Sequence, residues 1–560
     1  MHFVKCINNR KGGVCRPSLS LGETMETYNL EKFILLKKAN ASSDAFAEKV
    51  REYKNNGFSA AYEKESFAVL TNGEETVNVS LKGKKNTLRV IKESGVNLPP
   101  AAVTVEEKCD TLLTQMQTIF FSCDNGMCYI IRLADGSFVI IDGGVGTFDE
   151  PKHFLEILNA QKMGDGVPLI RAWFITHPHR DHFGLFEVLM ETHRGDFLLD
   201  TLIYNWPDKD YAQHRGNTTR FDEIAEKQEG FSVITGRTGY TFTYGENVFE
   251  ILFSPDDILP KKLGNVNDTS LVIRHTYKDK TILYLGDVMT PAAEIILEEC
   301  RGETLRADIL QVAHHGFWGA SDDLYRVIRP KTLLWPIPDY HYFNMSQLPQ
   351  NDYLVNSGEI ETVYFSSLGD VTLNLSSTHV SKRHEKPLPY VADFSQKSMM
   401  KLGWSCIHKG YSVFRAPKGE FTEKGIRITT PDDAPSMVEI LKPMQIAGLK
   451  RLSVHIEGEI EKASKFGFIY NYKNPKEIDE SAIVPLSVEK GPFSYTLQMD
   501  VESKLLVVLK NGSKVFTATY APDERHGIAF LLSEATVHFL KVTVGEMFFT
   551  NSETRDILLI

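Results

Sequence analysis

The pattern of apolar and polar residues changes twice along the chain and divides it into three regions. In residues 25–100, SSDAFAEKVREYKNNGF places apolar residues at helical spacing behind a serine cap and ends at Asn-Asn-Gly. The segments SFAVL, TVNVSL and TLRVIKE that follow alternate like short strands. This region is predicted to be a small α+β accessory domain, preceded in residues 1–24 by a disordered or vestigial leader.

Strands alternate with helices in residues 108–378. The segments TIFFSC, MCYIIRL, SFVIIDGG and LIRAWFI are typical of strands, and PKHFLEILNAQK and FGLFEVLMETH have the apolar spacing of amphipathic helices. Later segments, including TILYLGD, ILQVAHHG and DVTLNLS, continue the same alternation. Mixed strands with flanking helices predict an α/β domain of the layered αββα type.

Residues 400–560 are rich in strand patterns, such as RLSVHIEG, FSYTLQM, KLLVVLK and VHFLKVTV. Turn residues separate these segments at intervals typical of β-sandwiches. We therefore predict a C-terminal β-sandwich of jelly-roll type. The stretches NLPPAAVTVEEK and SQKSMMKLGWS mark the two boundaries between the three regions.

Composition limits the classes of function. A chain of 560 residues is too long for one hydrophobic core, and 42% hydrophobic with 24% charged residues is ordinary for a soluble protein. A formal net charge of −11 disfavours broad contact with a nucleic-acid backbone. Seven scattered cysteines without CxxC spacing favour a reducing compartment, and no apolar run reaches the ~18 residues of a membrane span. The expected location is the cytoplasm.

The closest cluster of candidate metal-ligating residues follows the apolar run LIRAWFI. It is the segment THPHRDH, which contains His177, His179, Asp181 and His182. The spacing of His177 and His179 puts both imidazoles on one side of an extended segment. Asp181 and His182 can face the same centre from the turn that follows. Such a set supplies ligands for two adjacent divalent metals, and its nitrogen and carboxylate donors suit zinc, with manganese or iron as alternatives.

Four motifs in one order give the chain a resemblance to a known family. THPHRDH, FVIIDGG, TILYLGD and ILQVAHHG resemble, across residues 108–378, the motifs of the metallo-β-lactamase fold hydrolases. The paired histidines of HHG and the upstream NVNDTSLVIRH are similar to the hydrolase domain of bacterial competence DNA-uptake proteins and to phosphorylcholine esterases. The resemblance implies the αββα fold and two divalent metal ions that polarise a bridging water.

The resemblance also implies roles for individual residues. The first metal would be held by His177, His179 and Asp287, and the second by Asp181, His182, His315 and the shared Asp287. Asp142 would orient a ligand histidine from behind. Two residues would take part in catalysis: His314, as an electrophile or proton donor to the substrate, and Asp181, which could also orient water.

One position departs from the family pattern. Many family members carry a further ligand histidine in the middle of the domain, where this chain has Asn267-Asp268-Thr269-Ser270. Either Asp268 or Asn267 fills that position, or the first metal keeps more water. The other candidates are the remote histidines His193, His214 and His275.

Aromatic and polar residues near the late histidines are candidates for substrate contact. Phe317 and Trp318 could wall the pocket or belong to the packing. His341 lies where related domains contact substrate from a late loop, and three neighbours could share that role: Tyr340, Tyr342 and Asn344.

Three functions are compatible with these observations. The first is a metal-dependent hydrolase of a small phosphodiester, for which long nucleic acids would be poor substrates. The second is hydrolysis of a lactone, thioester or other carboxylic ester, because fold alone does not choose the substrate. The third is a binding protein that uses the β-sandwich for a carbohydrate or protein partner and carries a degenerate hydrolase domain.

Overall fold

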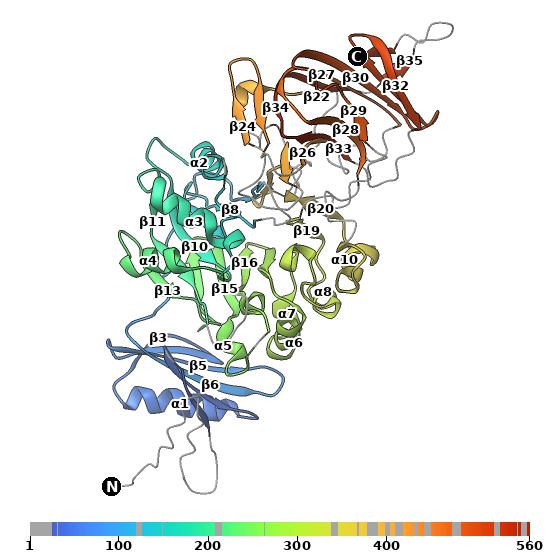
Figure 1. Cartoon of the computed structure of the whole chain (residues 1–560). Helices are drawn as coiled ribbons and strands as arrows, with labels where there is room; N and C mark the ends of the chain where they lie inside the picture. The colour runs from blue at the N-terminus through green and yellow to red at the C-terminus, as the bar shows by residue number, and fades with distance from the viewer. Residues whose placement is uncertain are drawn as a thin grey trace.

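The computed structural model of the protein describes residues in all three predicted regions (Figure 1). These residues are 25–30, 32–118, 126–147, 149–207, 216–262, 264–337, 345–366, 369–377, 390–397, 402, 404–408, 418–430, 435–441, 450–472, 483–519, 527–545, 547–549 and 557–559. The leader predicted at residues 1–24 lies outside them. Among the described residues, no helix is long and apolar enough to cross a membrane.

The N-terminal module is one antiparallel sheet with a helix packed on it. The strand order is β1-β2-β6-β5-β4-β3. The Ser42 hydroxyl accepts a hydrogen bond from the Ala45 backbone N–H at 3.1 Å and so caps α1, whose Phe46 and Val50 pack into the module's core. The elements are β1 (Glu26–Asn29), β2 (Phe33–Lys38), α1 (Ser43–Asn55), β3 (Ser59–Lys64), β4 (Phe67–Thr71), β5 (Glu75–Lys82) and β6 (Thr87–Ser94).

The central domain contains two mixed sheets packed face to face. In the described residues one sheet has the order β13-β12-β10-β9-β8-β7-β21 and the other β14-β15-β16-β17-β18-β19-β20. The first sheet comprises β7 (Leu112–Gln115), β8 (Tyr129–Arg132), β9 (Phe138–Ile141), β10 (Leu169–Ile175), β12 (Thr201–Tyr204), β13 (Ser232–Thr235) and β21 (Val371–Asn374), with β11 (Leu198–Leu199) beside β10. The second comprises β14 (Thr241–Tyr244), β15 (Asn247–Phe253), β16 (Val272–Tyr277), β17 (Lys280–Tyr284), β18 (Ile309–Gln311), β19 (Thr332–Trp335) and β20 (Thr362–Phe365).

Helices cover the outer face of each sheet, which confirms the predicted αββα layering. An apolar cluster containing Phe174 and Phe249 fills the space between the sheets. Outside the first sheet lie α2 (Glu150–Gln161), α3 (Arg180–Thr192) and α4 (Thr219–Lys227). Outside the second lie α5 (Pro255–Ile258), α6 (Thr290–Glu299), α7 (Gly302–Leu305), α8 (Asp322–Ile328) and α10 (Asp352–Asn356). The strand predicted at TIFFSC falls mainly on residues outside the described set, and β7 lies before it.

Parallel strands at the centre of both sheets direct their carboxyl ends to one region. In the first sheet β9 and β10 are parallel neighbours, and in the second β17, β18 and β19 are parallel. Asp142 follows β9, His177 follows β10, Asp287 follows β17, and His314 follows β18. The fold therefore brings residues that are far apart in the sequence to the same edge.

The C-terminal region is a β-sandwich with its own core, as predicted. In the described residues one antiparallel sheet has the order β24-β25-β34-β27-β30-β31-β32, with β22 beside β34, and the other has the order β23-β26-β33-β28-β29. The strands are β22 (Tyr390–Val391), β23 (Ser405–His408), β24 (Lys418–Phe421), β25 (Ile426–Thr429), β26 (Ser436–Leu441), β27 (Arg451–Lys462), β28 (Lys465–Tyr472), β29 (Ile483–Pro485), β30 (Gly491–Asp500), β31 (Leu505–Lys510), β32 (Ser513–Thr519), β33 (Gly527–Ser533) and β34 (Thr536–Gly545), with β35 (Met547–Phe549) and β36 (Ile557–Leu559) as a separate pair.

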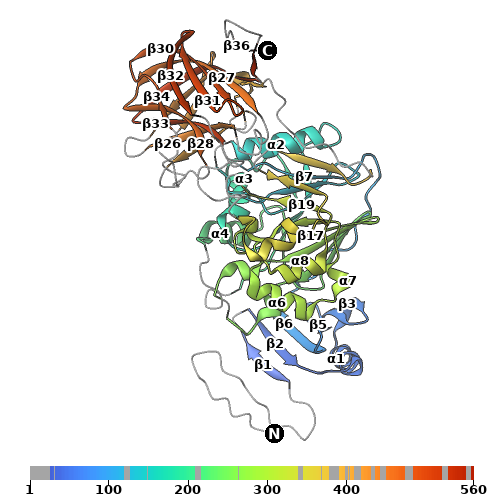
Figure 2. The same cartoon turned by 90° about the vertical axis from the view of Figure 1, so that its right-hand side faces the viewer.

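The N-terminal module and the sandwich lie at opposite ends of the central domain (Figures 1 and 2). Buried ion pairs join the module to the central domain: Arg89 lies 2.7 Å from Glu299, and Arg237 lies 2.7 Å from Glu93. Phe67 of β4 belongs to the same apolar cluster as the core between the two central sheets. The module is thus packed onto the domain rather than tethered to it.

Candidate metal centre

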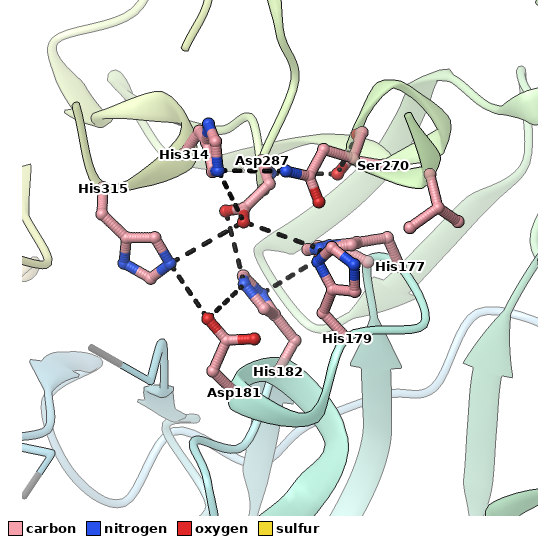
Figure 3. Close-up of polar contacts among 12 residues, drawn as sticks. His177, His179, Asp181, His182, Ser270, Asp287, His314 and His315 are labelled. Atoms are coloured by element: carbon pink, nitrogen blue, oxygen red, sulfur yellow. Dashed lines mark hydrogen bonds and ion pairs between the residues drawn. The ribbon is translucent and has the colours of Figure 1, made fainter. Parts of the chain in front are cut away.

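The residues of THPHRDH converge with two later segments at the carboxyl edge of the sheets (Figure 3). His177 and His179 precede α3, and Asp181 and His182 lie in its first turn. The other donors are Asp287, which follows β17, and His315, which lies in the short helix η2 (Ala313–Gly316).

These side chains form two groups that could each hold an ion, and Asp287 belongs to both. One group has three members, His177, His179 and Asp287, and the other has four, Asp181, His182, Asp287 and His315. Within each group one ligand atom per residue lies within 4.8 Å of the others. This division is the one expected from the resemblance.

In the group of four, two close pairs of donor atoms have the spacing of metal ligands. His182 Nε2 lies 3.3 Å from Asp287 Oδ1, and His315 Nε2 lies 3.3 Å from Asp181 Oδ2. Tetrahedral zinc with bonds of about 2.0 Å separates its ligands by roughly 3.3 Å. Three of these buried atoms have no hydrogen-bond partner in the described structure: His182 Nε2, His315 Nε2 and Asp287 Oδ1. Buried polar atoms are normally paired, and a cation between these three atoms would satisfy all of them.

Two hydrogen bonds orient the rings of His182 and His315 so that their Nε2 atoms face the candidate metal centre. His182 Nδ1 donates to Asp142 Oδ2 at 2.8 Å, and His315 Nδ1 donates to the Pro336 carbonyl at 2.8 Å. Both Nδ1 atoms therefore carry a proton, and when the rings are neutral Nε2 is the atom that can bind a metal. Asp142 also accepts from the Thr176 backbone N–H at 2.8 Å and from the Thr176 hydroxyl at 3.0 Å.

The electrostatics of the cluster are dominated by burial and mutual charge. Burial would raise the pKa of Asp287, but the charges of His182, His315 and His177 outweigh it and hold that pKa well below its usual range. Burial lowers the pKa of His177 well below its usual range, and the charge of His182 adds to this effect. An ionised aspartate beside a neutral histidine is the state in which both groups bind cations.

Several residues around the centre have left-handed backbone conformations, which are unfavourable for residues other than glycine. The φ angles are 55° at Asp142, 49° at His314 and 54° at His315. Each such residue costs of order 1–3 kcal/mol, so surrounding contacts must hold it in place. Trp335 Nε1 donates to the His315 carbonyl at 2.9 Å, and Asn351 Nδ2 donates to the Gly316 carbonyl at 2.9 Å.

The structure does not bring Asp268 into either donor group. Its Oδ1 accepts hydrogen bonds from the backbone N–H groups of Met289, at 3.2 Å, and Ala292, at 3.1 Å, at the start of α6. Burial raises the pKa of Asp268 to about 6, while these two bonds oppose the shift. Asn267 is also outside both groups, and its Nδ2 lies 3.0 Å from His314 Nε2.

The other candidate histidines are placed as follows. His193 ends α3 and lies 2.8 Å from Asp196, and His275 stacks on Phe249 with its Nε2 2.9 Å from Asn247 Oδ1. Neither belongs to a donor group. Four other predicted residues, His214, Tyr340, His341 and Tyr342, lie outside the described residues, as does Asn344.

The two aromatic residues after the late histidines differ in exposure. Phe317 packs against the core under α6 and α8, with its ring centroid 6.3 Å from that of His315. Trp318 is 56% exposed and has a φ of 44°. Phe317 is therefore a packing residue that also borders the site, whereas Trp318 is accessible from solvent.

The residues that fix the Asp287 turn are not among those predicted from the sequence. Gln311 Oε1 accepts from the backbone N–H groups of Leu285 and Gly286, each at 2.7 Å, and Ser270 Oγ accepts from the Asp287 N–H at 2.9 Å. A glutamine in the otherwise apolar ILQVA was a usable signal. Thr176 was also missed, although it stands directly before the histidine motif.

Residues 122–334 match the family model of the Metallo-beta-lactamase superfamily. No curated protein is significantly similar to the chain. Among solved structures, CmlA from Streptomyces venezuelae, a diiron beta-hydroxylase, is similar at 10% identity and a TM-score of 0.29, covering 48% of this chain and 54% of its own. The chain thus spans about half the length of that relative.

Two further solved structures are similar over a smaller part of the chain. A protein with a galectin-like fold from Bacillus subtilis is 10% identical, with a TM-score of 0.20, and the match covers 28% of this chain and 94% of that one. The metal-free carbohydrate recognition domain of Emp46p is 10% identical, also with a TM-score of 0.20, and covers 28% of this chain and 95% of its own. At such scores none of these structures bears on function.

Proposed function

We propose that the protein is a dinuclear metal-dependent hydrolase that acts on a small phosphodiester. The observation that carries the proposal is the pair of donor groups that share Asp287 on a domain of the Metallo-beta-lactamase superfamily. Imidazole nitrogens and carboxylate oxygens favour zinc, with manganese or iron next. Two bound ions would supply an activated water and positive charge for the oxygens of the substrate.

His314 is the proposed electrophile at the candidate metal centre. Its Nε2 lies 4.0 Å from Asp287 Oδ2 and 3.0 Å from the Asn267 amide, so this atom faces the donor groups (Figure 3). Burial lowers the pKa of His314, which favours a neutral ring. A neutral imidazole would stabilise charge on the substrate by a hydrogen bond and would not transfer a proton to it. The Asn267 amide would hold the ring in this orientation.

A phosphodiester suits a site of this kind because its two non-bridging oxygens can each meet a cation. The resemblance to the competence-protein branch supports the same class. A net charge of −11 disfavours long nucleic acids, which require many contacts between phosphates and basic residues. Trp318, exposed beside the late histidines, could contact a compact organic group of the substrate.

The C-terminal sandwich is proposed to bind a carbohydrate or a protein partner. It has its own closed core and contributes no residue to either donor group in the described structure. Glycan-array binding of the full chain tests the carbohydrate alternative.

The test of the proposed function is a comparison of kcat/KM for four substrates: bis(p-nitrophenyl) phosphate, p-nitrophenyl phosphate, a lactone and a DNA fragment. We expect metal-dependent cleavage of the diester, with DNA at least about tenfold weaker at ~150 mM salt. His314→Gln should lower kcat on the diester at least about tenfold. The matched control is His193→Gln, which changes a partly exposed histidine outside both donor groups. A preference for the lactone would replace the diesterase assignment with that of an ester hydrolase.

A further inference from the structure

Glu150 is a buried carboxylate at the start of α2 that belongs to neither donor group. Glu150 is 0% exposed, whereas the side chain of Glu156 on the same helix is 39% exposed. A carboxylate that is removed from water is costly unless hydrogen bonds satisfy it. The groups that donate to Glu150 therefore indicate what it does in the molecule.

Two backbone N–H groups donate hydrogen bonds to Glu150. Its Oε2 accepts from Gly146 at 2.7 Å and from Thr147 at 3.2 Å. Both donors lie in residues 143–147, a segment of sequence GGVGT that directly follows Asp142 and that we call the glycine loop. Hydrogen bonds to an ionised carboxylate are stronger than those between neutral groups. Glu150 therefore fixes the end of the glycine loop that lies away from Asp142.

The glycine loop packs against α3 at very short backbone distances. A Cβ added to Gly146 would lie 2.4 Å from the Gly184 carbonyl oxygen, and a Cβ added to Gly184 would lie 2.1 Å from the Val145 carbonyl oxygen. The Leu185 N–H donates to the Gly144 carbonyl at 3.2 Å. Such a close approach of two backbones requires glycine on both sides. A displacement of the glycine loop is therefore transmitted directly to α3.

The start of α3 carries two members of the four-donor group, Asp181 and His182 (Figure 3). The glycine loop is connected to both of them. The Gly144 N–H donates to the Met127 carbonyl at 2.8 Å, and the Met127 N–H donates to the Asp181 carbonyl at 3.0 Å. His182 is held by Asp142, the residue directly before the loop. The position of the glycine loop therefore affects two ligands of the second metal.

We propose that Glu150 is a positioning residue for the second metal and acts through the glycine loop and α3. Without its carboxylate, the N–H groups of Gly146 and Thr147 lose their acceptor, and the loop can move away from α3. The first metal should be affected less, because His177 and His179 precede α3. The proposal rests on the dinuclear site of the proposed function, but not on the identity of the substrate.

The test is a zinc titration of the full-length protein in two backgrounds that each keep one complete donor group. His179→Ala keeps the four-donor group, and His315→Ala keeps the three-donor group. We expect Glu150→Leu to weaken zinc binding at least about tenfold in the first background and less than about threefold in the second. Glu150→Gln keeps an acceptor oxygen and should stay within about threefold of its parent in both. The matched control is Glu156→Leu on the same helix, which should leave zinc binding unchanged.

Gly184→Ala disturbs the same contact from the side of α3 and leaves Glu150 in place, so it decides the question if Glu150→Leu does not fold. Alanine is the better helix former, so weaker zinc binding at the second site would come from the contact with Val145. Circular dichroism checks the fold of each variant.

Three results would overturn the proposal alone: unchanged second-site binding in a folded Glu150→Leu or Gly184→Ala variant, an equal loss at both sites, or a loss in Glu150→Gln as large as that in Glu150→Leu. If the His179→Ala background bound no zinc at all, the proposal would fail together with the dinuclear site of the proposed function. The two failures are therefore distinguishable.

Discussion

Asp142 acts on the candidate metal centre through other residues. It holds His182 by one oxygen and receives both the backbone N–H and the hydroxyl of Thr176, so a single buried carboxylate orients the ligand loop. Removing such a partner from a ligand histidine typically costs 10–100-fold in metal affinity. We therefore predict that Asp142→Ala lowers metal affinity by about 10–100-fold while the protein stays folded. Isothermal titration with zinc measures the change, and Asp165→Ala, an exposed substitution, is the control.

Asp268 provides a pH-dependent prediction. Its pKa in the folded protein is raised to about 6, above the ordinary value of 3.8. Ionisation of Asp268 therefore opposes folding, and the free energy of unfolding falls as the pH rises from about 4 to about 6. An asparagine side chain at this position would keep an acceptor for the Met289 and Ala292 N–H groups without the charge. Asp268→Asn should therefore raise the free energy of unfolding by roughly 1–3 kcal/mol at pH 8, and by about 1 kcal/mol less at pH 5.

Urea denaturation at both pH values measures this difference, and metal content checks the alternative role. If Asp268 were instead a ligand, the asparagine variant would lose about one ion per chain. Unchanged metal content together with the expected gain in stability would support the role of Asp268 as a hydrogen-bond acceptor at the start of α6.

Single residues of the site were predictable where their motif is local. His177, His179, Asp181 and His182 lie within six positions, so sequence spacing alone brings them together. The contacts of Asp268 with α6 depend on a backbone 21 to 24 residues away, and no local pattern encodes them. The sequence therefore predicts Asp268 as a candidate ligand, whereas in the structure its carboxylate accepts hydrogen bonds from backbone N–H groups at the start of α6.

At the scale of elements, η2 is the segment whose conformation most closely controls the position of a donor. Gly316 has a φ of 83°, and a Cβ at this position would lie 2.7 Å from the Trp335 ring nitrogen. We predict that Gly316→Ala destabilises the protein by about 1–3 kcal/mol and weakens metal binding, because His315 must move with the turn. Thermal unfolding and zinc titration are the measurements.

The matched substitution is Gly302→Ala at the start of α7. The nearest atom to its added Cβ is 3.8 Å away, and the backbone there is not left-handed. This variant should be neutral or slightly stabilising. If Gly316→Ala were equally harmless, the histidine turn would not be the strained segment that its angles indicate.

The layering of the central domain followed from sequence because its strands are buried and apolar and its helices are amphipathic. The conformation of η2 did not, because left-handed angles at His314 and His315 depend on contacts with Trp335 and Asn351 rather than on local preference. The order of strands within each sheet was likewise not readable from the pattern.

At the scale of the molecule, the junction between the N-terminal module and the central domain is an ionic contact between buried groups. Arg89 is 4% exposed in its side chain and contacts both Glu299 and Asp257. Removing one partner of such a pair leaves buried charges unpaired, which typically costs 3–5 kcal/mol. We predict a loss of about this size for Arg89→Ala in urea denaturation. Lys54→Ala, which removes an exposed pair with Glu63, should cost less than about 1 kcal/mol.

The sequence predicts the module as a separate accessory domain, and the residues that pair with its Arg89 lie 168 and 210 positions further along the chain. Only the folded structure shows that its charges are completed by the central domain. A small effect of Arg89→Ala, close to that of Lys54→Ala, would indicate a loosely attached module.

Asp287 is the residue on which both proposed metal sites depend, because it belongs to both donor groups. The decisive experiment counts metal ions per chain, by inductively coupled plasma mass spectrometry, in the zinc-loaded wild-type protein and in Asp287→Ala. We predict two ions in the wild type, and fewer than one in a variant that keeps its circular dichroism spectrum. A wild-type protein that retains no ion after loading, or a folded Asp287→Ala that retains both, would contradict the shared dinuclear site.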